Sequence, residues 1–161
     1  MPPAEPVTLQ PITDANRDAV VALRVAPAQE AFVASVADSL HEAAATPNAK
    51  PWYRAIYAGA EPVGFVMISD GIDARFTEYL GPYFLWRLLI DARYQRLGLG
   101  RAALDLVVAY VRTRPGADTL FTSYVPGPGS PLDFYLRYGF EPTGEVFDGE
   151  PVLALALRTE A

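Results

Sequence analysis

The fold is decided by the stretch Leu88-Leu89-Ile90-Asp91-Ala92-Arg93-Tyr94-Gln95-Arg96-Leu97-Gly98-Leu99-Gly100-Arg101-Ala102-Ala103-Leu104. An apolar strand passes here through a short polar turn into a helix whose first turn holds glycines. Backbone N–H groups in such a turn, together with the positive end of a helix, form a socket for a pyrophosphate. Gly98 and Gly100 let a ligand approach the backbone closely, and Arg96 and Arg101 are placed to contact its phosphate oxygens.

Hydrophobic patterns on both sides of this stretch predict alternating strands and helices. We expect strands at 7–10, 52–58, 62–69, 83–91, 119–125, 140–147 and 152–157, and helices at 13–24, 27–45, 98–112 and 130–138. The strand at 83–91 is apolar on both parities, so it should be central and buried on both faces. Asp148-Gly149 predicts a type I′ hairpin turn. The order predicts an α/β (α+β) fold, with a mixed, mostly antiparallel twisted sheet of six to seven strands, a central β-α-β unit and four helices.

Composition narrows the class of protein. The chain has 161 residues, 51% of them hydrophobic, which predicts a single globular domain over 1–161. A formal charge of −6 disfavours nucleic acid as a partner and favours cationic small molecules. The absence of cysteine excludes disulfides and a thiolate nucleophile, and no metal site is expected. No stretch resembles a signal peptide or a membrane span, so we expect a cytoplasmic protein without a membrane partner.

The glycine-rich turn has two other interpretations besides a pyrophosphate site. Residues 98–103 also match the loose dinucleotide fingerprint G-x-G-x-x-G/A. That fold places an acid at the end of the following strand, where this chain has Ser123-Tyr124. Alternatively, the glycines only turn a loop into a helix.

Gln95-Arg96-Leu97-Gly98-Leu99-Gly100 resembles the Q/R-x-x-G-x-G/A acetyl-CoA signature of the GNAT superfamily of N-acetyltransferases. Phe134-Tyr135-Leu136-Arg137-Tyr138-Gly139-Phe140 resembles a second segment of that family, and the order of elements matches over nearly the whole chain. Within the superfamily, 25–34, 86–91, 143–145 and Gly149-Glu150 are similar to bacterial spermine/spermidine acetyltransferases of the BltD type.

The resemblance implies a GNAT-like fold whose β-α-β unit binds acetyl-CoA, and direct attack of an amine on the thioester within one complex. It implies that Tyr135 protonates the departing thiolate or donates a hydrogen bond to it. The cofactor-binding residues that it implies are Leu88, Leu89, Ile90, Gln95, Arg96, Leu97, Gly98, Leu99, Gly100, Arg101, Ala102, Ser130 and Tyr135. One departure is Pro128, which stands where the family often has an asparagine and offers no donor.

The resemblance also implies that the first two helices and the loop near Glu78-Tyr79 form the walls of the acceptor site. Its candidate residues are Gln29, Glu30, Phe32, Trp52 and Glu78. Arg87 lies in an otherwise apolar strand, and we expect it to pair with a buried acid, either Glu145 or Asp91. His41 is expected to be an exposed helix residue.

These observations predict an acetyl-CoA-dependent N-acetyltransferase for a primary amine of a small molecule, with a polyamine favoured. The alternatives are an acetyltransferase for an antibiotic, an amino acid or a protein N-terminus, and a sensor that binds acyl-CoA without catalysis. A dinucleotide-dependent enzyme is a further alternative. A homodimer is a hypothesis, with its interface at Val152, Leu153, Leu155 and Leu157.

Overall fold

The computed structural model describes residues 5–76 and 78–158, which contain a seven-stranded sheet of order β1-β2-β3-β4-β5-β7-β6. The strands are β1 Val7–Gln10, β2 Pro51–Ala58, β3 Glu61–Asp70, β4 Tyr83–Ile90, β5 Thr119–Ser123, β6 Glu141–Phe147 and β7 Glu150–Ala156. β4 and β5 are parallel, and the other neighbouring pairs are antiparallel. This confirms the predicted mixed sheet. The dinucleotide-binding alternative is wrong, because that fold requires a mostly parallel sheet.

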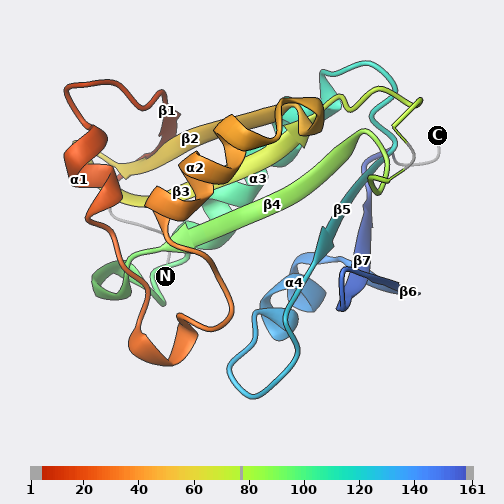
Figure 1. Cartoon of the computed structure of the whole chain (residues 1–161). Coiled ribbons are helices and arrows are strands. Elements are labelled where there is room, and N and C mark those ends of the chain that lie inside the picture. The colour runs from red at the N-terminus through yellow and green to blue at the C-terminus, as the bar shows by residue number, and fades with distance from the viewer. Residues whose placement is uncertain (1–4, 77, 159–161) are drawn as a thin grey trace.

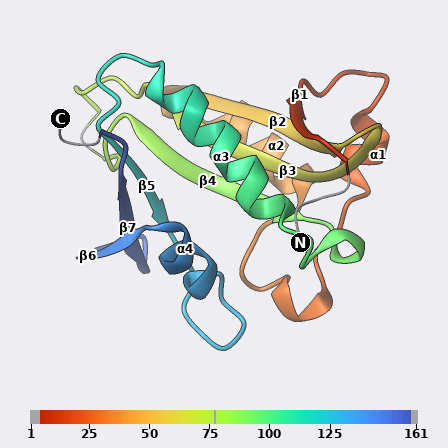
Figure 2. The ribbon, with the colours of Figure 1, turned by 180° about the vertical axis from the view of Figure 1, so that it is seen from behind.

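Helices cover both faces of the sheet. The α-helices are α1 Arg17–Val21, α2 Val36–Ala45, α3 Leu99–Arg112 and α4 Leu132–Tyr138, and short 3₁₀ turns occupy Pro27–Gln29, Pro47–Ala49 and Ala92–Tyr94. α1 and α2 lie on one face (Figure 1) and α3 on the other (Figure 2). α3 is amphipathic, and its apolar residues recur at helical spacing in the core: Leu99, Ala103, Leu104, Val107, Val108 and Val111. Tyr135 of α4 belongs to the same core cluster, so α3 and α4 share a face.

A bulge in β4 determines where the sheet opens. The register between β3 and β4 shifts at Trp86, which has no partner of its own in β3. Trp86 and Arg87 therefore both face α2. Trp86 packs there against a second core cluster, formed by α1, α2 and the sheet, and Arg87 contacts Glu42. A bulge bends its strand, and the ladder between β4 and β5 ends at the pair Leu85 and Thr122. Beyond that pair the two strands diverge (Figure 1).

The predicted helix at 27–45 is wrong in its first half. After the 3₁₀ turn Pro27–Gln29 the chain forms a loop, and α2 begins only after Ser35, whose Oγ accepts a hydrogen bond from the Asp38 amide at 3.1 Å. Phe32 leaves the helical path and its ring faces Gly127 and Gly129 in the loop before α4. A contact between distant segments thus overrides the local pattern. The predicted helix at 13–24 is also too long, because only α1 Arg17–Val21 is α-helical.

The C-terminal hairpin forms as predicted, but its apolar residues do not form an outer surface. Asp148 and Gly149 have φ angles of 50° and 78°, which confirms the type I′ turn. Val152, Leu153 and Leu157 are 1 to 3% exposed and belong to the interior, and Leu155 is half-buried and packs against the same core. The hypothesis that these side chains form a dimer interface is therefore wrong. Dimerisation itself stays a prediction.

Candidate active site

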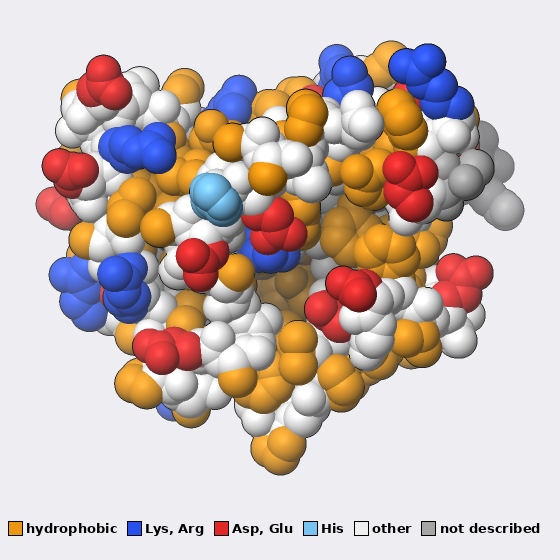
Figure 3. All heavy atoms as spheres, in the orientation of Figure 1, with side chains coloured by type: hydrophobic (Ala, Val, Ile, Leu, Met, Phe, Trp, Pro, Cys, Tyr) orange, Lys and Arg blue, Asp and Glu red, His pale blue; other side chains and the backbone are white. Residues whose placement is uncertain are grey.

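A cleft of about 1150 Å³ opens where β4 and β5 diverge. Its walls come from the loop between α1 and α2, from β4, from the N-terminus of α3, from the loop into α4, and from the β6–β7 turn. Figure 3 shows a hollow on the α2 side of the molecule, with hydrophobic side chains inside it and acidic side chains around its rim. The cleft therefore joins both faces of the sheet through the gap between two strands.

The turn into α3 presents a run of unpaired backbone amides. None of the amides of residues 96–101 donates a hydrogen bond within the described part of the chain. Arg96 and Gly98 have φ angles of 65° and 79°, and alternation with left-handed residues turns successive N–H groups to one side. Gln95 fixes the turn, because its Nε2 donates to the carbonyl oxygen of Ile90 at 2.8 Å and to Oε1 of Gln29 at 2.7 Å.

The residues of this turn fit a pyrophosphate of a cofactor such as CoA. A Cβ added at Gly100 would lie 3.5 Å from the ring of Phe134 and 3.7 Å from Ile90, so glycine leaves this corner of the cleft open. The guanidinium of Arg101 lies 5.4 Å from the centre of the Tyr138 ring, and Arg96, Arg101 and Arg137 line the same part of the cleft. Helix dipole, free amides and arginines all favour an anion here.

Asp91 ties this turn to the segment that follows α1. Its carboxylate is 5% exposed and accepts from the Arg24 amide at 2.9 Å, the Arg93 amide at 3.0 Å and Arg93 Nε at 2.8 Å. Burial would raise the pKa of Asp91, yet these hydrogen bonds outweigh burial and hold the pKa below its usual value of 3.8. The ionised carboxylate therefore stabilises the fold beside the site.

We expect Asp91→Asn to lower the free energy of unfolding by about 1 to 3 kcal/mol at neutral pH, because a buried charged acceptor is lost. Since the pKa of the folded state is depressed, this stabilisation is present above the unfolded value of 3.8 and is lost as the pH falls through the folded value. Urea unfolding at neutral pH and near pH 3 would measure it. The control is Asp73→Asn, whose pair with Arg75 is exposed. Equal losses in both variants would contradict the prediction.

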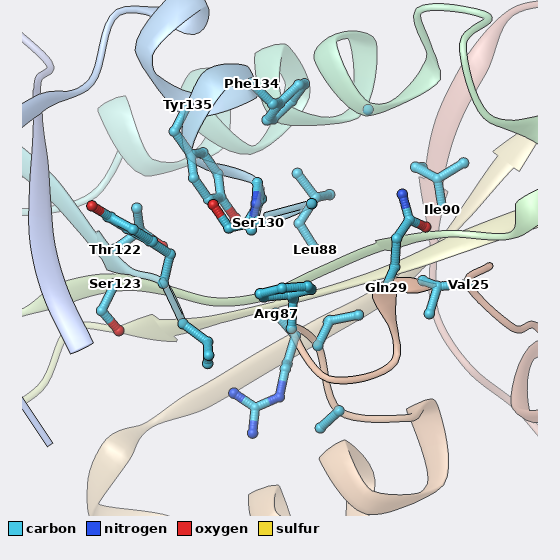
Figure 4. A pocket seen from close by; sticks show the side chains of 18 of the residues that line it. Val25, Gln29, Arg87, Leu88, Ile90, Thr122, Ser123, Ser130, Phe134 and Tyr135 are labelled. Carbon is cyan, nitrogen blue, oxygen red and sulfur yellow. The ribbon is translucent and has the colours of Figure 1, made fainter. Parts of the chain in front are cut away.

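Tyr135 enters the cleft from α4 and is 6% exposed (Figure 4). Its ring packs edge-on against Phe134 and Phe140, with centroids 5.5 and 5.3 Å away. Burial raises the pKa of Tyr135 to about 12, and the nearby hydroxyl of Thr122 offsets this only in part. The phenol thus keeps its proton through the neutral range and is available as an acid.

The α2 side of the cleft is aromatic and acidic. Phe84 and Phe147 lie 6.3 Å apart there, and Trp86 lines the same wall. Carboxylates line this half of the cleft at Glu30, Glu42, Asp148 and Glu150. This pattern matches a cationic, partly apolar ligand.

The predicted partner of Arg87 is wrong. Arg87 Nη2 donates to Glu42 Oε2 at 2.6 Å, and neither Glu145 nor Asp91 takes that place. The bulge at Trp86 turns Arg87 toward α2, which the sequence pattern does not reveal; Figure 4 shows Arg87 extending away from Tyr135. Glu145 lies exposed on β6.

Most predicted site residues meet in the cleft. Those that line it are Gln29, Glu30, Phe32, Leu88, Ile90, Gln95, Arg96, Gly98, Leu99, Gly100, Arg101, Ser130 and Tyr135. Five others do not line it: Leu89 lies in the core, Leu97 is 48% exposed, Ala102 lies within α3, Glu78 is an exposed loop residue, and Trp52 stacks on Tyr110 of α3 at 4.4 Å. His41 is exposed on α2, as predicted.

Sequence reasoning missed the wall formed by Phe84, Trp86, Ser123, Phe147 and Glu150. Only the hairpin signal at Asp148-Gly149 could have indicated part of it, because that turn returns Glu150 toward the end of β5. In residues 5–76 and 78–158 no cluster of His, Cys, Asp or Glu could hold a metal ion. No helix in the same range has the length and apolar character needed to cross a membrane.

The divergent strands, the amide-lined turn and the buried tyrosine together define an acyl-CoA type of site, and sequence comparison gives the family. A model of the acetyltransferase (GNAT) family matches residues 17–140, and the chain belongs to this family. The predicted superfamily membership and enzyme class are thereby confirmed.

Individual proteins that resemble this chain in sequence or in structure give a finer comparison than the family does. A spermine/spermidine N(1)-acetyltransferase of Bacillus subtilis is 29% identical over 157 residues, covering 94% of this chain and 99% of the relative. A crystal structure of an acetyltransferase from Thermus thermophilus has a TM-score of 0.67 at 22% identity, covering 94% of this chain and 97% of its own. An aminoglycoside acetyltransferase crystallised with coenzyme A has a TM-score of 0.72 at 17% identity, covering 93% and 94%. The two structures share the fold.

Proposed function

We propose that the protein transfers the acetyl group of acetyl-CoA to a primary amine of a polyamine. The observation that carries this proposal is the opposite charge of the two halves of one cleft. The half beside α3 and α4 is lined by Arg96, Arg101 and Arg137, with one acid, Asp133. The other half, on the α2 side, is lined by Glu30, Glu42, Asp148 and Glu150, with one base, Arg87, which pairs with Glu42. The first half suits the phosphates of CoA, and the second suits an acceptor that carries several positive charges.

In this proposal different residues of the chain bind the cofactor and donate a proton. Amides of residues 96–101 would hold the pyrophosphate, and the open edge of β4 at Leu88 and Ile90 would align the rest of the cofactor. Bound acetyl-CoA supplies a thioester carbonyl as the electrophile. Tyr135, kept protonated by burial, donates its proton to the departing sulfur. Holding acceptor and donor together supplies a large part of the rate enhancement.

Neighbouring proteins support the same assignment. The relative from Bacillus subtilis is named for spermine and spermidine, and an acetyltransferase structure similar to this fold was crystallised with acetyl-CoA. The high coverage of the Bacillus subtilis relative means that the acceptor half of the cleft, and not only the cofactor half, is included in the alignment. A cytoplasmic location remains a prediction.

A thiol-release assay with acetyl-CoA tests the proposal against spermine, spermidine, hexylamine, an aminoglycoside, an amino acid and a short peptide. We expect spermine and spermidine to give the highest kcat/KM and hexylamine, with one charge, a far lower value. A preference for the amino acid or the peptide would contradict the polyamine assignment. CoA binding without turnover of any acceptor would favour the sensor alternative.

A further inference from the structure

The acceptor half of the cleft contains several carboxylates, and their surroundings differ. Glu42 is paired with Arg87 at 2.6 Å, so the charge of its carboxylate is already compensated. Glu30 and Asp148 are exposed to solvent, where attraction for a cation is weak. Glu150 is half-buried, and no basic side chain in the described part of the chain forms an ion pair with it. An uncompensated, partly desolvated carboxylate is the strongest site for an ammonium group.

Glu150 is also held in a defined position. It follows the type I′ turn and faces Phe147 across the hairpin, and its Oε1 accepts a hydrogen bond from Ser123 Oγ at 3.1 Å. Ser123 is the last residue of β5 and follows Thr122, which contacts Tyr135. Successive strand residues point to opposite faces. Glu150 and Tyr135 therefore approach the gap between β4 and β5 from opposite sides of the sheet.

We propose that Glu150, positioned by Ser123, binds the acceptor ammonium and takes its proton. This inference rests on the proposed function and adds to it the residue that prepares the nucleophile. An alkylammonium has a solution pKa near 10.4, so it must lose a proton before it can attack. Phe84 and Phe147 flank the same wall and provide an apolar surface for the methylene groups beside the charge.

The proton and electron pairs balance. The ammonium gives one proton to Glu150, and the nitrogen lone pair forms the C–N bond with the thioester carbonyl carbon. The C–S bond breaks, the sulfur takes the proton of Tyr135, and the nitrogen returns its second proton to the Tyr135 oxygen. Glu150 then releases its proton to solvent. One ammonium and one thioester thus give one amide, one thiol and one proton.

The test is Glu150→Gln in the full chain, which keeps the shape and the Ser123 contact but removes the charge. We expect kcat/KM for spermine to fall about 30-fold, with the KM for acetyl-CoA unchanged. Calorimetry with spermine and CoA, which requires no turnover, should show weaker spermine binding. The amine of trifluoroethylamine is largely neutral at working pH. The substitution should therefore lower the activity on trifluoroethylamine less than it lowers the activity on spermine.

The matched control is Glu145→Gln, because Glu145 is exposed on β6 and does not line the cleft. It should behave as the unmodified protein in every measurement. If Glu150→Gln keeps the rate and the spermine affinity of the active unmodified protein, the inference is overturned while the proposed function stands. If the unmodified protein acetylates no amine at all, the proposed function is overturned.

Discussion

Replacing Tyr135 by phenylalanine is expected to lower kcat about 1000-fold and to leave the affinity for CoA unchanged, because only the proton donor to the sulfur is lost. Phenylalanine keeps the edge-on packing against Phe134 and Phe140, so the fold should persist. Since burial raises the pKa of Tyr135 to about 12, kcat of the unmodified protein should not decline through loss of this proton below about pH 10.

Steady-state kinetics with calorimetric CoA binding would measure the Tyr135→Phe variant. Tyr53→Phe is its control, because Tyr53 packs against Phe65 outside the cleft and loses the same hydroxyl. Unchanged kcat in Tyr135→Phe would remove Tyr135 from the mechanism. A parallel loss of CoA affinity would instead assign it to cofactor binding.

The second large effect is expected at Gly100. A valine there would add methyl groups toward Phe134 and Ile90, which already lie 3.5 to 3.7 Å from the position of a Cβ. The side chain would fill the corner beside the free amides, so we expect CoA affinity to fall about 100-fold. Gly100→Ala places its Cβ at ordinary contact distance and should have a much smaller effect.

Calorimetric titration with CoA would rank the two Gly100 variants. Ala109→Val, at an exposed position of the same helix, controls for the reduced helix propensity of valine. Urea unfolding would confirm that all three variants fold. CoA affinity retained by Gly100→Val would contradict a pyrophosphate site at the start of α3.

Elements with a strong local pattern could be predicted from the sequence, and those shaped by distant contacts could not. The predicted helix 98–112 matches α3 Leu99–Arg112, because its apolar spacing is regular along the whole length. The predicted helix 27–45 fails where Phe32 packs against a loop almost a hundred residues away. No pattern within that segment announces such a contact.

The apolar pattern that predicted a central strand at 83–91 has two structural causes. β4 is fourth in the sheet order, as expected for a central strand. Its apolar residues occupy both parities partly because the strand is covered on both faces, and partly because the bulge at Trp86 exchanges the faces midway. Leu85 and Leu88 contact the same core cluster although their parities differ. An alternation pattern cannot distinguish these two causes.

The cofactor half of the site was predictable because its chemistry lies in one continuous stretch around Gly98 and Gly100. The acceptor half was predictable only in part, at Gln29, Glu30 and Phe32 of the loop before α2, because the rest of its wall is assembled from α2, β4, β5 and the last hairpin. Glu42 and Arg87 are 45 residues apart, and their pairing depends on a bulge. Trp52, an aromatic residue suited to a cation, faces α3 instead.

The short ladder between β4 and β5 also bears on how this protein avoids aggregation. Past Leu85, the edge of β4 no longer pairs with β5, and an open strand edge is a template for the strands of other chains. Here that edge lies inside a cleft walled by α4 and by the α1–α2 loop. A slender ligand can enter, whereas the broad edge of another molecule's sheet cannot. The fold thus leaves this strand edge accessible to a small ligand and protects it by shape, without covering it.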